Sequence, residues 1–257
     1  MKKLKHITFC TTCMNRTEDL KQTYLKSIKT AITVDKNTKF VLLNYNSTDD
    51  LDTWVKKNLT TYIQNNILKY IKTNKPKIFH PSHAKNVAHI NSETDIICNL
   101  DADNILTSEY VNLVLHYFNN NDTMVLQGGE QWSYGRICSL REVFIMLGGY
   151  DEQMTGWGSE DSDYILRAKN FLPGGKDGKV CEITTDRSAM LKYGTNGECF
   201  GPHEDSIVWE NGIRPKLNGG NGSSFSFSNI KNNLKLSQHN FKNKNYIANM
   251  NTKWGVI

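Results

Sequence analysis

DIICNLDAD (residues 95–103) joins an apolar run directly to two aspartates. The apolar part predicts a buried β-strand over Asp95–Leu100, because four to eight consecutive apolar residues are typical of a strand that is covered on both faces. Asp101 and Asp103 follow at its carboxyl end. In an extended backbone they would project from one face and could share a hard divalent cation. The alternative is a strand-to-helix turn in which Asp103 or Asn104 caps the next helix.

The rest of the first half alternates between strand and helix patterns. Strands are predicted at His6–Cys10, Lys39–Leu43 and Ile67–Ile71, and helices at Thr17–Ile32, Leu51–Lys57 and Ser82–Ile90. Strands separated by helices pair in parallel, and such sheets bind ligands beyond the carboxyl ends of their strands. The polar loops at 44–50 and 101–104 lie at such ends. The pattern predicts an α/β fold with a mostly parallel central sheet flanked by helices.

The second half is less regular. A helix at Glu142–Leu147 is expected to stop at Gly148-Gly149, and a longer one runs over Glu160–Lys169. Residues 211–228 are rich in Gly, Asn and Ser, which predicts a mobile loop. After this loop we expect a short strand at Leu234–Ser237 and a terminal helix at Tyr246–Asn251.

Composition narrows the class of protein. The chain has 257 residues, of which 38% are hydrophobic and 22% charged, as in a packed globular domain. A net charge of +5 suits a phosphate-bearing ligand without indicating nucleic acid. No stretch is long enough to cross a bilayer, although peripheral membrane contact stays open. The six cysteines include one isolated Cys-x-x-Cys pair. This usage favours reduced thiols and a cytoplasmic location.

GWGSEDSD (residues 156–163) is the second chemical signal. Three carboxylates fall in the first turn of a predicted helix, where the helix dipole favours negative charge. Three acids exceed what a cap requires, and a carboxylate held there is suited to take a proton from a sugar hydroxyl. The adjacent Trp157 could pack on a sugar face or belong to the core.

Taken together, these motifs resemble the glycosyltransferases of the GT-A fold, and within them the β-1,4-galactosyltransferase and chondroitin-synthase-like branch. The matching segments follow the same order along nearly the whole chain. They are TTCMNR (11–16), NSTD (46–49), HAKN (83–86), DAD (101–103) and LGGYDE (147–152) leading into GWGSED (156–161). The last of these is the most specific.

The resemblance implies a single GT-A domain over 1–257, a Rossmann-like nucleotide-binding fold. Its nucleotide-sugar-binding half would be 1–104 and its acceptor-binding half 105–257. The mobile 211–228 loop would either order over the donor as a lid or stay disordered. The nucleotide-binding residues implied are Thr11, Asn15, Arg16, Asn44, Asn46, Ser47, Asp49, Lys85 and Asp101. Many relatives have an aspartate where this chain has Asn44, which puts recognition of the base in doubt.

The resemblance also implies a Mn²⁺ or Mg²⁺ cofactor, with Asp103 as the direct ligand, Asp101 beside it and a histidine near the C-terminus. His239 fits the closing segment better than His203 does. Asp161 would be the catalytic base, and the acceptor would be bound by Glu160, Trp157 and Asp163.

The implied reaction is a direct displacement with inversion. A UDP-activated galactose, N-acetylgalactosamine, glucose or N-acetylglucosamine would pass to a hydroxyl of a glycan, glycoprotein or glycolipid. Two alternatives stay open: a retaining transferase of the same fold, and a carbohydrate-binding relative that has lost catalysis. A phosphohydrolase fits less well, because it would carry its Asp-x-Asp motif after the first strand.

Overall fold

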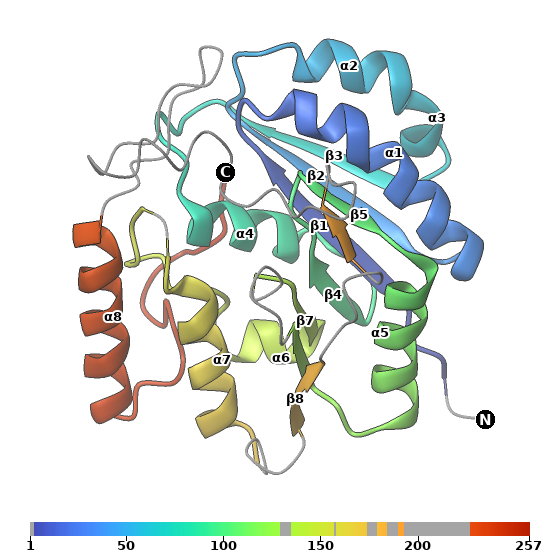
Figure 1. Cartoon of the computed structure of the whole chain (residues 1–257). Coiled ribbons are helices and arrows are strands. Elements are labelled where there is room, and N and C mark those ends of the chain that lie inside the picture. Colours follow the sequence, from blue (N-terminus) through green and yellow to red (C-terminus); the bar gives the residue numbers. More distant parts are fainter. Residues whose placement is uncertain (1–2, 129–134, 157, 174–178, 184–189, 193–226) are drawn as a thin grey trace.

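The computed structural model describes residues 3–128, 135–156, 158–173, 179–183, 190–192 and 227–257. In these parts of the chain a central sheet carries helices on both faces, with α1 (Thr17–Val34) and α4 (Pro81–Ile90) on opposite sides of it (Figure 1). The α/β fold that the sequence predicts is thus confirmed. Within the same residues, no helix is both long and apolar enough to span a bilayer.

Seven strands of the described residues form the main sheet, in the order β3-β2-β1-β4-β7-β6-β8. Its parallel part consists of β1 (Ile7–Cys13), β2 (Lys39–Tyr45), β3 (Leu68–Thr73) and β4 (Ile96–Asn99). Beyond β4, β7 (Ile137–Leu140) runs antiparallel to β4 and to β6 (Val125–Gly128), and β8 (Val180–Ile183) is parallel to β6. A separate pair joins β5 (Asn104–Leu106) to β9 (Met190–Lys192).

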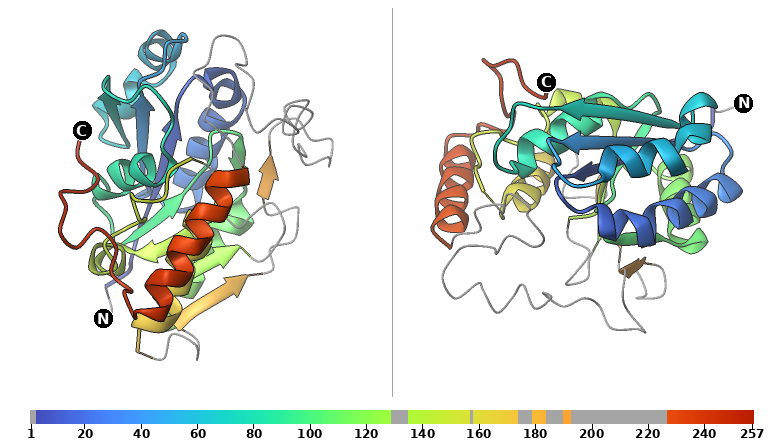
Figure 2. Two further views of the ribbon diagram at one scale, coloured as in Figure 1. Left: turned by 90° about the vertical axis from the view of Figure 1, so that its left-hand side faces the viewer. Right: turned by 90° about the horizontal axis from the view of Figure 1, so that it is seen from above.

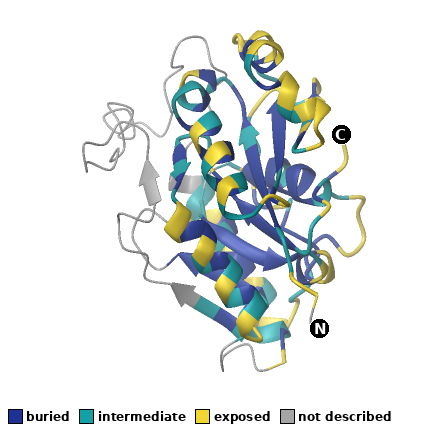
Figure 3. Ribbon diagram, turned by 90° about the vertical axis from the view of Figure 1, so that its right-hand side faces the viewer, coloured by how far each residue is buried: buried dark blue, intermediate teal, exposed yellow. Residues whose placement is uncertain are grey.

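The helices divide between the two faces of the sheet. They are α1 (Thr17–Val34), α2 (Leu51–Asn58), α3 (Thr60–Gln64), α4 (Pro81–Ile90), α5 (Ser108–Asn120), α6 (Arg141–Met146), α7 (Glu160–Phe171) and α8 (Phe227–Lys242). Alternate residues of β1 serve the two faces: Phe9 packs in the cluster that contains α1, and Cys10 in the cluster that contains α4. The central strands are therefore buried on both sides (Figure 3), whereas the edge strand β3 exposes Lys69 and Lys72.

The four parallel strands end at one edge of the sheet. Cys13 of β1 lies opposite Asn44 of β2, and Cys10 lies opposite Asn99, the last residue of β4. The loops that follow these strands, at 14–16, 46–50 and 100–103, are therefore neighbours in space. This is the edge at which parallel sheets bind their ligands.

The C-terminal segment returns across the second half of the domain. The Ala248 amide donates to the Leu147 carbonyl over 2.9 Å. Asn249 donates from its side chain to the carbonyls of Gly148 (2.8 Å) and Tyr150 (2.7 Å). Trp254 then packs edge-on against Phe144, with ring centroids 6.0 Å apart. These contacts fix the Gly-Gly turn that precedes α7.

Two predictions for the C-terminal region are wrong. The expected strand at Leu234–Ser237 is part of α8, which packs beside α7 (Figure 2). The alternation of Leu234 and Leu236 suggested a strand, but Asn233, Ser237 and Asn240 turn inward at helical spacing while Leu234 is 49% exposed. The expected helix at Tyr246–Asn251 is instead a series of turns, in which Asn249 has a positive φ of 55°.

The Asp101–Asp103 segment is also not extended. The Asn104 amide donates to the Asp101 carbonyl over 3.0 Å, which closes a turn before β5 begins. The two carboxylates are consequently presented by a turn and do not project from one strand face.

Asn249 provides a test of how the C-terminal segment stabilises the domain. Asn249→Ala should lower the free energy of unfolding by about 2–3 kcal/mol, because two buried carbonyls and the Glu152 amide lose their partner. Urea unfolding followed by circular dichroism measures this. Asn251→Ala, at an exposed position of the same segment, is the matched control and should stay within about 0.5 kcal/mol. Equal effects of the two substitutions would contradict the assignment.

Candidate active site

The loops after β1 and β2 interlock through one asparagine. Asn15 has a positive φ of 58°, and its Oδ1 accepts hydrogen bonds from the amides of Thr48 (2.6 Å) and Asp49 (3.3 Å). Its own amide donates to Ser47 Oγ over 3.1 Å. In return, Asp49 accepts from the amide of Thr17 at 3.0 Å. The two loops therefore form one rigid rim at the carboxyl edge of the sheet.

The side chain of Asn44 makes three hydrogen bonds within the protein. Its amide nitrogen donates to Asp52 (3.1 Å) and to the Tyr70 hydroxyl (3.0 Å), and its oxygen accepts from the Ser47 amide (2.7 Å). Asp52 also pairs with Lys72. Burial raises the pKa of Asp52, but hydrogen bonds from Lys72, Tyr70 and Asn44 outweigh it and lower the pKa overall. A polar cluster thus lies at this end of β2 and β3.

Of two other predicted nucleotide-binding residues, one lies in the rim and the other is buried in the sheet. Asn46 lies in the rim and donates to the Pro76 carbonyl over 2.7 Å. Thr11, by contrast, is fully buried within β1. The structure therefore brings Asn15, Asn46, Ser47 and Asp49 together at the edge and leaves Thr11 in the core.

The two aspartates of the turn after β4 have different neighbours. Asp101 accepts from Asn99 Nδ2 over 3.0 Å, while Asp103 accepts from Asn104 Nδ2 over 2.7 Å. Asp103 Oδ2 lies 3.8 Å from Nη2 of Arg16, which also pairs with Asp19. The Asp-x-Asp turn therefore faces the rim formed by the loop after β1.

Gly135 lies between two of the acidic groups. A Cβ atom placed on it would lie 3.2 Å from Asp161 Oδ2 and 3.7 Å from Asp101 Oδ2. These two carboxylate oxygens, from segments sixty residues apart in the sequence, consequently border the same small space. The carbonyl of Gly135 also accepts from Asn99 over 2.9 Å, which holds it beside the turn.

Lys85, Glu160 and Asp161 form the charged centre of the site. The Lys85 ammonium lies 3.0 Å from Glu160 Oε1 and 2.7 Å from Asp161 Oδ1. The other oxygen of Glu160 accepts from the Gly158 amide over 3.1 Å. Lys85 joins α4 to the first turn of α7, whereas the resemblance had implied a nucleotide-binding role.

The environment of Asp161 suits proton transfer near neutral pH. Burial raises the pKa of its carboxyl to about 7; Lys85 opposes the rise, and Glu160 and Asp101 add to it. Its side chain is still 21% exposed. Burial lowers the pKa of Lys85, but the Asp161 and Glu160 carboxylates outweigh this and raise it. Lys85 is therefore charged at neutral pH, while Asp161 can gain or lose a proton.

Asp163 turns away from this centre. It pairs with Arg167 over 2.7 Å, and the two side chains are only 1% and 3% exposed. Arg167 also donates to the carbonyls of Leu147 and Gly149, each over 2.8 Å. Asp163 is thus buried and supports the Gly-Gly turn through Arg167.

The predicted metal-binding histidine is not near the aspartates of the turn. His239 lies in the last turn of α8 and is exposed, with Nε2 3.1 Å from Asn243 Nδ2. The opposite end of α8, at Ile230, is the part that lies against Gly158. Trp157, His203 and most of the predicted 211–228 lid lie outside the described residues. Within those that are described, no three His, Cys, Asp or Glu side chains gather as a metal site.

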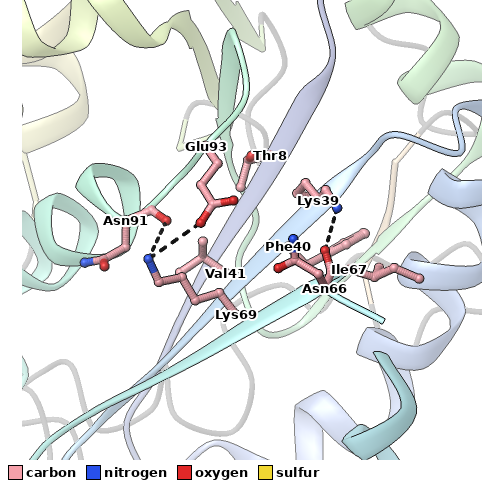
Figure 4. A pocket seen from close by; sticks show the side chains of 9 residues that line it. All are labelled: Thr8, Lys39, Phe40, Val41, Asn66, Ile67, Lys69, Asn91 and Glu93. Atoms are coloured by element: carbon pink, nitrogen blue, oxygen red, sulfur yellow. Dashed lines mark hydrogen bonds and ion pairs between the residues drawn. The ribbon is translucent and has the colours of Figure 1, made fainter. Parts of the chain in front are cut away.

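Two hollows lie elsewhere on the described surface. The pocket in Figure 4 is close to the amino ends of β1, β2 and β3 and holds about 10 Å³, room for one water. A larger hollow of about 480 Å³ lies between the 151–153 turn, α8 and residues 245–252. Neither is lined by Lys85, Asp101 or Asp161.

The sequence analysis did not name Asp52 or Gly135, and it did not predict the ion pairs of Lys85 with Glu160 and Asp161. Asp52 and Gly135 stand outside the motifs: Asp52 contacts Tyr70 and Lys72 of β3, and Gly135 lies beside Asp101 and Asp161. The helical spacing of Asp163 and Arg167, four residues apart, was a signal that could have shown their ion pair.

Comparison with solved structures shows the fold. S. aureus TarS 1–349 in complex with UDP superimposes with a TM-score of 0.56 at 13% identity, over 70% of this chain and 58% of that one. The mannosyltransferase PcManGT from Pyrobaculum calidifontis, in complex with GDP-Man and Mn²⁺, gives 0.56 at 15% identity, over 72% and 59%. The chain thus spans less than two thirds of either protein. No curated protein matches it in sequence.

These similarities define the class: the chain has the GT-A fold of glycosyltransferases. A family model described as the N-terminal domain of galactosyltransferase matches residues 127–174. This segment contains the Gly-Gly turn and the first turn of α7, so it includes Glu160 and Asp161. The resemblance to GT-A glycosyltransferases is confirmed for the fold, and the family match supports the resemblance to galactosyltransferases over residues 127–174 alone.

Proposed function

We propose that this protein is a metal-dependent, inverting glycosyltransferase that moves a sugar from a UDP-sugar to an acceptor hydroxyl. One observation carries the proposal. Asp161 Oδ2 and Asp101 Oδ2 border the same space beside Gly135, so a proton acceptor faces the turn expected to hold the nucleotide and metal. Direct displacement requires this arrangement, with the base on one side of the anomeric carbon and the leaving group on the other.

The rim at the carboxyl edge would bind the nucleotide. Asn15, Asn46, Ser47 and Asp49 lie there in a fixed arrangement, and the asparagine-centred cluster around Asn44 adds Asp52 and Tyr70. Arg16 points from the same loop toward Asp103 and supplies positive charge near the diphosphate. A preformed rim lowers the entropic cost of binding.

The Asp-x-Asp turn fits a hard divalent cation. Asp103 is an oxygen donor with one contact to a side-chain amide and a longer one to Arg16, and Asp101 has one oxygen beside Gly135. Mn²⁺ or Mg²⁺ bound by one or two carboxylates takes its other oxygens from phosphate and water, so two aspartates suffice. When bound, the cation would neutralise charge on the departing diphosphate.

Asp161 is the better base of the two acidic side chains. Both oxygens of Glu160 are engaged, one by Lys85 and one by the Gly158 amide. In the transfer, the acceptor oxygen bonds to the anomeric carbon, its proton passes to Asp161 Oδ2, and the bond to the diphosphate breaks, releasing UDP. Asp161, with a pKa raised to about 7 by burial, is suited to this step. A retaining transfer does not require a base at this position, so the presence of Asp161 favours inversion.

The donor sugar and the acceptor are proposed only as classes of molecule. One structural neighbour was solved with UDP-GlcNAc and another with GDP-Man, so nucleotide sugars are the donors of similar folds. We propose a UDP-linked galactose, N-acetylgalactosamine, glucose or N-acetylglucosamine as the donor, and a glycan, glycoprotein or glycolipid as the acceptor. A few pocket contacts decide among such sugars.

A panel of nucleotide sugars tests the reaction. With Mn²⁺ present, one UDP-sugar should be consumed, and chelator should abolish consumption. Asp161→Asn should lower the rate of transfer to acceptor about 100- to 10,000-fold, because the proton acceptor is lost, while UDP binding changes little. Asp103→Ala should weaken metal-dependent UDP binding. Release of UDP and calorimetric UDP titration are the measurements.

The inactive binding relative predicts otherwise. In that case no nucleotide sugar is consumed with any metal, and Asp161→Asn leaves saccharide binding unchanged. Formation of a product with retained anomeric configuration, read by proton NMR, would overturn the inverting step alone. Exposed Lys56→Ala serves as the variant whose activity should match the parent chain.

The pH profile tests the role of Asp161 separately. The ionised carboxylate is the base, so kcat/KM should rise with pH through a limb near the pKa of about 7.

The stability of the fold should change with pH in the opposite direction. A carboxyl with a raised folded-state pKa stabilises the fold below about pH 4 and loses this contribution as pH rises toward about 7. Asp161→Asn should remove the kinetic limb and flatten this part of the stability curve. An unchanged limb in Asp161→Asn would assign the titration to another group.

A further inference from the structure

Lys85 is a buried cation. Its side chain is 9% exposed, and it extends from the middle of α4 toward the first turn of α7. Lysine is seldom buried to this degree unless its charge is matched. The partners that match it are Glu160 and Asp161, at 3.0 and 2.7 Å. The ring of Tyr150 adds a cation–π contact, with its centroid 5.0 Å from the ammonium.

The two oxygens of Asp161 are not equivalent in this arrangement. Oδ1 accepts the hydrogen bond from Lys85, and Oδ2 lies toward Gly135 and Asp101. Lys85 thereby fixes the rotation of the carboxylate, and among the described residues no hydrogen bond engages the oxygen that faces the proposed reaction space. Glu160 is fixed by the same ammonium through Oε1 and by the Gly158 amide through Oε2.

The residue after Lys85 holds the backbone that carries it. Asn86 donates from its side chain to the Tyr150 carbonyl over 2.8 Å and accepts from the Tyr150 amide over 2.8 Å. This pair of bonds ties α4 to the turn before α7. Adjacent residues of one helix therefore set the distance between Lys85 and the two acids, so the ammonium is positioned by the fold.

We propose that Lys85 is a positioning residue that aims Asp161 Oδ2 at the acceptor hydroxyl and keeps the Glu160–Asp161 pair together, rather than a ligand of the nucleotide. The inference rests on the proposed function for the identity of Asp161 as the base. A swing of Lys85 to a diphosphate would leave two neighbouring acids in a buried site without a cation, which is strongly unfavourable.

Three variants separate the two roles. Lys85→Met keeps the length of the side chain and removes the charge, and Lys85→Arg keeps the charge. Lys69→Met removes an exposed lysine near the opposite edge of the sheet, where it contacts Glu93 at 3.9 Å, and is the matched control. Calorimetry with UDP and Mn²⁺ measures nucleotide binding, and the pH dependence of kcat/KM measures the state of the base.

With Lys85→Met, the UDP dissociation constant should stay within about threefold of the parent chain, because the lysine does not touch the nucleotide. The kinetic limb should move to higher pH by about one unit or more, since the base loses its neighbouring cation. The rate at neutral pH should fall about 100-fold and recover in part as pH rises, and Lys85→Arg should restore part of it. A tenfold or greater loss of UDP affinity with an unmoved limb would overturn the proposal and make Lys85 a phosphate ligand.

A stability cycle tests the ion pairs without any turnover. Lys85→Met should lower the Tm by about 10 °C, because two buried acids lose their counter-charge. The same change should cost clearly less in an Asp161→Asn background, where one acid is already neutral. If the parent chain consumes no nucleotide sugar yet this coupling is found, the proposed function fails and the pairing stands. Additive losses would overturn the pairing whatever the activity.

Discussion

The pairing of Lys85 with Glu160 and Asp161 is the interaction on which the arrangement of this site depends. Three ionisable groups are withdrawn from water together, which costs free energy unless each charge is matched at short range. These ion pairs require a fixed distance between α4, which carries Lys85, and the first turn of α7, which carries Glu160 and Asp161. Asn86 secures this by bonding the Tyr150 backbone. The arrangement of the candidate site therefore follows from how α4 is joined to the start of α7, as much as from the loops at the edge of the sheet.

The second half of the domain supports this junction. Arg167 holds the carbonyls of the Gly-Gly turn and neutralises Asp163, and Asn249 holds the same turn from the C-terminal segment. Gly156 and Gly158 have positive φ values of 71° and 104° and lie against Asn229 and Ile230 of α8. A side chain at either glycine would meet the helix and strain the backbone. Arg167 and Asn249 thus fix the Gly-Gly turn, and α8 packs against Gly156 and Gly158 just before Glu160.

Much of the fold and part of the site could be predicted from sequence. The alternation of strands and helices gave the parallel half of the sheet, and polar residues after β1, β2 and β4 marked the edge. The pairing of Lys85 with Glu160 and Asp161 could not be predicted, because these partners lie about 75 residues away and nothing local fixes that distance. Asp163 looked like Asp161 in sequence, yet two residues along a helix turn a side chain to another face. The C-terminal helix was misread because its inward face is polar, with Asn233, Ser237 and Asn240 in place of apolar residues.

A crystal structure of the parent chain with UDP and Mn²⁺ would test this account most directly. The account predicts the diphosphate and the cation at the Asp-x-Asp turn, with Arg16 nearby, and the uridine along the rim at Asn15 and Asp49. Lys85 should remain on Glu160 and Asp161, and Asp161 Oδ2 should face the space where the sugar would stand. Nucleotide bound elsewhere, or Lys85 turned to the diphosphate with Asp161 left unpaired, would contradict it.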